Sequence, residues 1–142
     1  LETLALRVRE HSKNADEIAK FLMDHPKVER VVHPSVASDL AKERADKYLS
    51  GGCGGLMGFE IKGGIEAGKQ FINSLEMFYH VANIGDSRSL AIHPASTTHS
   101  QLNEEELLSA GVTPGYVRLS IGLEHLDDIK DDLTQALDKV SV

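Results

Sequence analysis

A two-layer α/β sandwich is the fold that this sequence predicts, with helices on one face of a small, mainly antiparallel sheet. Amphipathic helical patterns open and close the chain, over residues 1–22 and 126–140. Between them, short apolar runs suited to strands alternate with helical spacing. The segment 116–121 places Tyr116, Arg118 and Ser120 on one face and apolar residues on the other. Helices packed on one side of a sheet account for all three observations.

The first half of the chain alternates between helix and strand. The opening helix has apolar residues at steps of three and four and must end before Pro26. Residues 28–32 form a short strand, and a second helix begins after Ser38 and runs to about Tyr48. Glycines at 51, 52, 54 and 55 break that helix, before a strand at 56–61 and helical spacing from Ile65 to Leu75.

The second half returns to strands before it closes on a helix. Residues 78–84 and 90–92 are extended segments around a turn at Gly85. Asn103 caps a short helix that Gly111 ends. After the alternating strand at 116–121, the last helix carries acids in its first turn and Lys139 in its last. The uncovered face of the sheet is expected to meet another domain or a partner subunit.

Composition sets the broad class of protein. With 142 residues and 41% hydrophobic content, the chain fits one globular domain over residues 1–142. A net charge of −7 without clustered cations argues against nucleic acid as a partner. No apolar run reaches the roughly 20 residues of a membrane helix, so we expect a cytoplasmic protein. The chain starts at Leu1 inside a helical pattern, which indicates a domain of a longer protein.

Arg118 is the most informative candidate for binding. A planar guanidinium held on a rigid strand is suited to grip a carboxylate through two parallel hydrogen bonds. The alternative is a surface arginine paired with an acid such as Glu124. The spacing of residues does not decide between them.

The segment from His93 to His99 contains Ser96, Thr97 and Thr98 and follows an apolar run, so it can present hydroxyls and imidazoles to a cleft. Hydrogen bonds within the loop are the simpler interpretation. Its two histidines have no third ligand nearby, and we predict no metal site. Cys53 is interpreted as a free thiol in a glycine-rich turn, not as a nucleophile.

The acidic residues fit exposed helix faces and first-turn positions, where solvation is their expected role. Their spacing singles out no pair of general acid and base. These residues are Asp39, Glu43, Asp46, Glu104 to Glu106 and the acids from Asp127 to Asp132.

Three ordered motifs, in segments 59–64, 93–99 and 117–124, resemble the Cys/Met-metabolism family of pyridoxal-phosphate enzymes. This family includes cystathionine gamma-synthase, methionine gamma-lyase and O-acetylhomoserine sulfhydrylase, and the resemblance covers essentially the whole chain. It implies a fold-type I transferase whose smaller C-terminal domain closes over the substrate. By that resemblance Arg118 binds the substrate α-carboxylate, and Asn83 and Thr98 help to enclose it.

The resemblance also implies what this chain does not supply. The lysine that forms a Schiff base with pyridoxal phosphate follows a Ser-x-Thr segment in the family, and none of the nine lysines here has that context. We therefore predict no catalytic and no cofactor-binding residue in this chain. The cofactor is expected on an N-terminal domain outside it, in a homo-oligomeric parent, with a tetramer expected.

Lyases of the family often have serine at the position of Asn83, so the segment 82–90 is closer to the sulfhydrylase branch. The resemblance implies γ-replacement of acetate by sulfide to give homocysteine, in the biosynthesis of methionine, with the fragment alone inactive. The alternatives are another transsulfuration enzyme of the family, or a free-standing module for small-molecule binding or dimerisation.

Overall fold

The computed structural model describes the backbone of residues 1–142 and all side chains except those of Asp39 and Glu104. The expected exposure of these two carboxylates therefore lies outside the described residues. The elements in chain order are α1 (Leu4–Met23), β1 (Val28–Val32), α2 (Asp39–Tyr48), β2 (Leu56–Ile61), α3 (Gly64–Ser74), β3 (Tyr79–His80), β4 (Leu90–Ile92), α4 (Glu104–Ser109), β5 (Tyr116–Ser120) and α5 (Leu126–Asp138). Two 3₁₀ turns that the sequence analysis did not predict, Pro34–Val36 and Pro94–Ser96, complete the fold.

The five strands form one mixed sheet in the order β1-β2-β5-β4-β3. All neighbours are antiparallel except β3 and β4, which are parallel and joined by only two residue pairs. At the opposite edge, the register between β1 and β2 shifts between Val28 and Arg30. The prediction of a small, mainly antiparallel sheet is confirmed.

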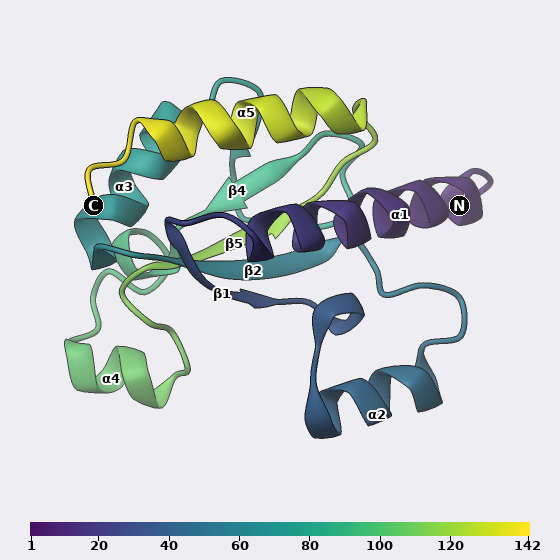
Figure 1. Ribbon diagram of the computed structural model, residues 1–142, viewed down its shortest axis with the longest axis horizontal. Coiled ribbons are helices and arrows are strands. Elements are labelled where there is room, and N and C mark those ends of the chain that lie inside the picture. The colour runs from purple at the N-terminus through teal and green to yellow at the C-terminus, as the bar shows by residue number, and fades with distance from the viewer.

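Helices α1, α3 and α5 cover one face of the sheet (Figure 1). Their apolar sides meet the inward-facing strand residues, and Phe59 and Phe71 lie edge to face with ring centroids 5.3 Å apart. Burial of Val117, Leu119 and Ile121 confirms the predicted inner face of β5. No helix in the part of the chain that the structure describes is long and apolar enough to cross a membrane.

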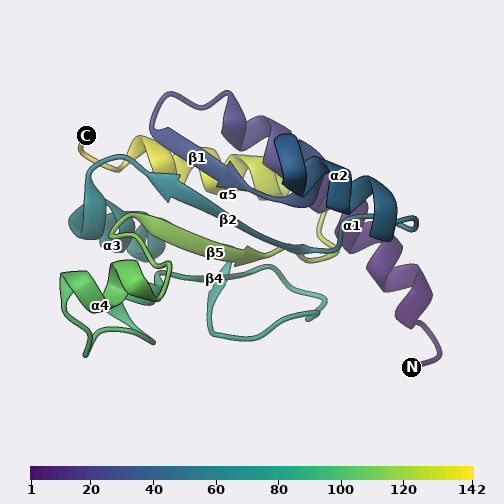
Figure 2. The same ribbon diagram turned by 90° about the horizontal axis from the view of Figure 1, so that it is seen from below.

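The opposite face of the sheet is only partly covered. Seen from that side, strands β1, β2, β5 and β4 run between α2 and α4, which stand at the two ends of the sheet (Figure 2). The outer residues of β5, which include Tyr116 and Arg118, lie on this face. We call it the open face. The three helices of the covered face confirm the predicted layering, and α2 and α4 flank the other side.

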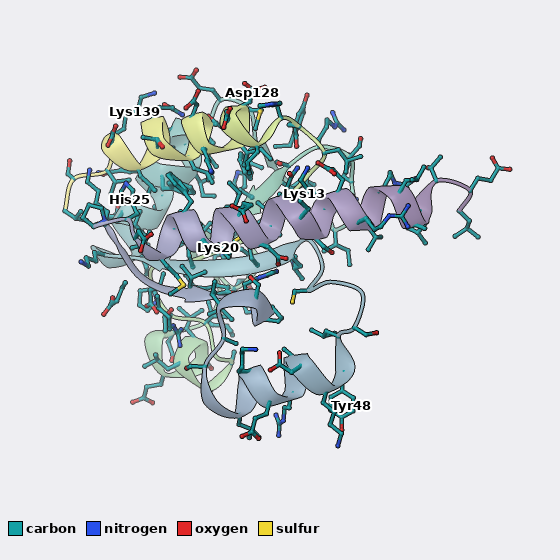
Figure 3. The ribbon with its side chains drawn as sticks, turned by 45° about the vertical axis from the view of Figure 1, so that its right-hand side comes forward. Lys13, Lys20, His25, Tyr48, Asp128 and Lys139 are labelled. Atoms are coloured by element: carbon teal, nitrogen blue, oxygen red, sulfur yellow. The ribbon has the colours of Figure 1, made fainter. Side chains whose placement is uncertain are left out.

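Both ends of α4 follow the predicted capping signals. Asn103 and Glu106 form a reciprocal capping box at the start of α4, with bonds of 3.0 and 2.9 Å. Gly111 has a positive φ of 75° just after that helix. On α5, Asp128 lies in the first turn and Lys139 at the opposite end (Figure 3). Lys139 follows the last helical residue, Asp138, so its predicted place in the last turn is off by one position.

Asp132 corrects the expectation that the acids of α5 are solvated. Only 6% of this residue is exposed, and its carboxylate accepts hydrogen bonds from the backbone N–H groups of Glu76, Met77 and Phe78 at 2.9 to 3.1 Å. These donors belong to the irregular segment between α3 and β3, which has no strand partner there. Burial of the charge is tolerated because three donors replace water.

We predict that Asp132→Asn lowers the free energy of unfolding by about 2–3 kcal/mol, because an amide group turns N–H donors toward backbone N–H donors. Urea unfolding of the chain measures the change. Asp131→Asn is the matched control, since Asp131 is the exposed neighbour on the same helix. Equal unfolding midpoints for the two variants contradict the prediction.

Candidate functional site

Arg118 lies at the centre of the sheet, on the open face. Its strand, β5, is paired on both sides, with Gly58 of β2 and Ile92 of β4 in register with Arg118. Hydrogen bonding on two edges fixes the backbone from which the guanidinium projects. The predicted placement on a rigid strand is confirmed.

The described carboxylates leave the guanidinium of Arg118 without an ion-pair partner. Among the described side chains no carboxylate lies within ion-pair distance of it. The alternative pairing with Glu124 is wrong, because the Glu124 carboxylate accepts hydrogen bonds from Ser89, at 2.6 Å from the backbone N–H and 2.8 Å from the hydroxyl. Arg118 therefore retains donors for an anion that comes from outside the described chain.

Asn83 meets Arg118 through its backbone. The Nη2 group of Arg118 donates to the carbonyl oxygen of Asn83 at 3.3 Å. The side-chain oxygen of Asn83 accepts instead from the N–H of Ile84 at 2.9 Å. Asn83 lies in the segment 81–88, which connects β3 and β4, and β4 is the neighbour of β5 in the sheet. This segment contacts Arg118 through the Asn83 carbonyl.

Thr98 lies apart from these two residues. Its hydroxyl is exposed and stands 2.8 Å from Nδ1 of His99. In the described part of the chain no hydrogen bond joins Thr98 to Arg118 or Asn83. The structure thus brings two of the three expected binding residues together.

A groove of about 700 Å³ lies on the open face beside Arg118. Its walls come from the outer sides of β1, β2 and β5 and from the segment that leads into α2, and they are mainly apolar. Tyr116 and Arg30 line it together with Arg118. Nη2 of Arg30 forms an ion pair with Oε2 of Glu60 at 3.3 Å. Of the two arginines that line this groove, Arg118 is therefore the one available to bind an anion.

Tyr116 explains a glycine inside β2. A Cβ atom on Gly58 would stand 2.1 Å from the Tyr116 hydroxyl, so the ring lies directly over the glycine. Burial raises the pKa of Tyr116, against the nearby positive charges of Arg118 and Arg30. The phenol stays neutral and forms a polar part of the groove wall. Sequence analysis missed this contact, although a glycine within an otherwise apolar strand was its signal.

His93 does not face a cleft, contrary to the expectation that this segment presents its imidazoles. The ring is fully buried, with Nδ1 2.8 Å from the Ser96 hydroxyl and Nε2 2.7 Å from the Pro114 carbonyl oxygen. It packs against Gly68, where an added Cβ would stand 2.4 Å from Nε2. The simpler interpretation of loop hydrogen bonds is correct for His93, and the ring joins the segment at 93–97 to the start of β5.

The glycine-rich turn holds a free thiol at Cys53. Burial raises the pKa of this thiol, which disfavours the reactive thiolate. The side chain of Ser12 accepts a hydrogen bond from the N–H of Gly54 at 3.0 Å. The turn is anchored to α1 and makes no cradle for phosphate at a helix start.

None of the nine lysines, all with described side chains, lines the groove beside Arg118. Most are engaged in surface ion pairs or in backbone contacts. Lys27, for example, donates to the carbonyl groups of Leu137 and Val140 at the end of α5, at 2.9 and 2.8 Å.

Together, the fold and the site define a two-layer α/β domain with Arg118 on its open face, where none of the described carboxylates forms an ion pair with it. A sequence profile described as Cys/Met metabolism PLP-dependent enzyme matches residues 1–138. The chain belongs to this family of pyridoxal-phosphate enzymes.

The relatives include several named as sulfhydrylases. An O-acetyl-L-homoserine sulfhydrylase of Leptospira meyeri is 55% identical over 99% of this chain and 32% of its own length. An O-acetyl-L-homoserine sulfhydrylase of Thermus thermophilus is 49% identical over 96% of this chain and 32% of its own length. An L-methionine gamma-lyase of Pseudomonas putida is 44% identical over 96% of this chain and 34% of its own length. The chain spans about a third of the length of these relatives.

A solved structure supports the same fold. A crystal structure from Campylobacter jejuni, described as a candidate O-acetylhomoserine (thiol)-lyase with N′-pyridoxyl-lysine-5′-monophosphate, superposes with a TM-score of 0.89. It is 47% identical and covers 96% of this chain and 32% of its own. The expected fold class is confirmed by this similarity.

Burial lowers the pKa of His93 and of His33. We therefore predict that the chain becomes less stable as the pH decreases. The folded chain keeps these rings neutral, whereas the unfolded chain protonates them near a pKa of about 6.5. Their stabilisation is therefore complete above that pH and is lost as the pH falls below it. NMR titration of the His93 ring, with unfolding measured across the same range, tests this. A His93 ring that becomes protonated at or above its ordinary pKa contradicts it.

Proposed function

We propose that this chain is the C-terminal, substrate-closing domain of an O-acetyl-L-homoserine sulfhydrylase. The reaction of the whole enzyme replaces the acetate group on the γ-carbon of O-acetyl-L-homoserine with sulfide. Its products are homocysteine and acetate, which places it in methionine biosynthesis. The domain contributes binding of the amino-acid substrate, and the chemistry at the γ-carbon belongs to the rest of the enzyme.

One observation carries the proposal: the Arg118 guanidinium stands on the open face without a carboxylate partner among the described residues. An amino-acid substrate has an α-carboxylate at every pH where such an enzyme works. Two parallel N–H···O bonds from one guanidinium would bind that group and fix its orientation. The contact to the Asn83 carbonyl uses Nη2 and leaves further N–H groups for the substrate.

Asn83 and Thr98 are proposed to complete the carboxylate site. Asn83 holds the guanidinium from one side through its carbonyl oxygen. The Thr98 hydroxyl is exposed, and we propose that it meets the carboxylate when substrate and the rest of the enzyme are in place. These roles rest on the family resemblance of the motifs around the two residues.

Pyridoxal phosphate is proposed to be bound by an N-terminal domain outside residues 1–142. That domain would cover the open face of the sheet, and the whole enzyme is proposed to be a homo-oligomer, with a tetramer expected. We also propose a cytoplasmic location, which the free thiol of Cys53 favours because reducing compartments preserve free thiols.

A second candidate is γ-elimination from methionine, since relatives named L-methionine gamma-lyase reach 44% identity. The two activities differ in their products. Full-length enzyme supplied with O-acetylhomoserine and sulfide yields homocysteine if the proposal is correct. Methanethiol from methionine, with no homocysteine from the first pair, supports the second candidate instead.

We predict that Arg118→Ala in the full-length enzyme raises the KM for O-acetylhomoserine by about tenfold to a hundredfold, the loss expected for a charged bidentate contact. The KM for sulfide, which has no carboxylate, stays unchanged. Arg118→Lys keeps the charge and loses the fork geometry, so it is expected to fall between Ala and wild type.

Arg44→Ala is the matched control, because Arg44 is an exposed arginine on α2 and lies outside the groove beside Arg118. Its kinetic constants should equal those of the unmodified enzyme. A KM for O-acetylhomoserine that is the same in Arg118→Ala and Arg44→Ala contradicts the assigned role.

A further inference from the structure

Ser89 and Glu124 form a compact hydrogen-bonded pair at the end of the segment that contacts Arg118. Ser89 is fully buried, and both of its donors go to Glu124: the backbone N–H to Oε1 at 2.6 Å and the hydroxyl to Oε2 at 2.8 Å. The same hydroxyl accepts from the N–H of Gly122 at 2.9 Å. One carboxylate thus binds two donors of one residue, the arrangement in which charged hydrogen bonds are strongest.

The close approach of the two segments depends on Gly122. A Cβ atom there would stand 2.3 Å from Oε2 of Glu124 and 2.5 Å from the backbone nitrogen of Ser89. Only a residue without a side chain allows the chain at 88–89 to lie against the exit of β5. This contact is part of the architecture of the site, because β5 carries Arg118 and the segment 81–88 carries Asn83.

Further bonds tie the segment 81–88 to β5 and its exit. Asn83 accepts from Arg118, Gly85 donates to the Ser120 hydroxyl at 3.3 Å, and Ser87 accepts from the N–H of Leu123 at 2.8 Å. The first two bonds are long and lie on exposed or half-buried atoms. The hydrogen bonds between Ser89 and Glu124 are shorter than these two and involve a charged carboxylate. They are therefore expected to be the strongest of these contacts.

The exit of β5 is itself anchored to α1, which keeps Glu124 in place. His11 donates from Nδ1 to the Ile121 carbonyl at 2.6 Å, because a carbonyl oxygen can only accept. The side-chain amide of Asn14 donates to the carbonyl groups of Gly122 and Glu124, each at 3.2 Å. Both side chains are buried on the inner side of α1. Glu124 therefore projects from a backbone that is anchored to α1.

We propose that Glu124 is a positioning residue for the carboxylate site and acts through Ser89. By fixing Ser89 it sets where the segment 81–88 lies, and so where the Asn83 carbonyl meets the guanidinium of Arg118. Without the carboxylate, the guanidinium keeps its charge and loses its orientation toward the substrate. This inference rests on the proposed function of Arg118 and adds a second residue, just after the end of β5, to the same site.

The test is a double-mutant cycle in the full-length enzyme with its cofactor, using Glu124→Ala, Arg118→Ala and the double variant. We expect Glu124→Ala to raise the KM for O-acetylhomoserine by about fivefold to tenfold, the coupling typical of residues in one hydrogen-bond network. The KM for sulfide should not change. In the Arg118→Ala background, replacement of Glu124 should have no further effect on the KM for O-acetylhomoserine.

Two milder variants separate an effect on substrate binding from a general folding defect. Glu124→Gln retains one oxygen acceptor for the N–H of Ser89 and is expected to give a smaller increase in KM than Ala. Ser89→Ala removes the hydroxyl and should change KM in the same direction as Glu124→Ala. Asp128→Ala is the matched control, since Asp128 is an exposed acid on the first turn of α5 (Figure 3), and it should behave as the unmodified enzyme.

The outcomes separate this inference from the proposed function. If Arg118→Ala raises KM for the amino acid but Glu124→Ala does not, the role of Glu124 is wrong and that of Arg118 stands. An equal effect of Glu124→Ala with and without Arg118 shows that Glu124 acts elsewhere, and it also overturns the inference. If Arg118→Ala leaves KM unchanged, the proposed function itself fails.

Discussion

Antiparallel pairing of β5 with β2 and β4 is the interaction on which the rest of the structure depends. It buries Val117, Leu119 and Ile121 under the helices and leaves Arg118 on the opposite side. The period of two in a strand makes these two results inseparable, since a shift of one residue would bury the guanidinium and expose the core. Core packing on one face therefore fixes the position of Arg118 on the other.

Polar side chains serve this fold where the backbone leaves regular structure. Asp132 takes the donors of the segment between α3 and β3, and His93 takes the carbonyl of Pro114. Asn14 does the same for the carbonyl groups after β5. Buried backbone groups need partners, and these side chains supply them where no helix or strand does. These side chains allow loops to lie close to a small sheet without the cost of unpaired donors and acceptors.

The sequence reveals the parts of this molecule that local rules control. Periodicity predicted α1, α5 and the two faces of β5, and Asn103 marked the start of α4. The contacts that sequence analysis missed are long-range. Asp132 has the sequence context of an exposed helical acid, and its backbone donors lie more than 50 positions earlier in the chain. Nothing in local spacing pairs Glu124 with Ser89, 35 residues away, instead of with Arg118.

Both edges of the sheet are poorly suited to accept another strand. At one edge β3 offers only two residues, and at the other β1 carries Glu29 and Arg30 beside an irregular register. Such features discourage the edge-to-edge pairing that leads to aggregation. Contacts with other proteins are therefore favoured on the faces of the sheet, where side chains determine which partner fits, over the addition of strands at its edges. A partner on the open face, as proposed above, would then be selected by side-chain contacts.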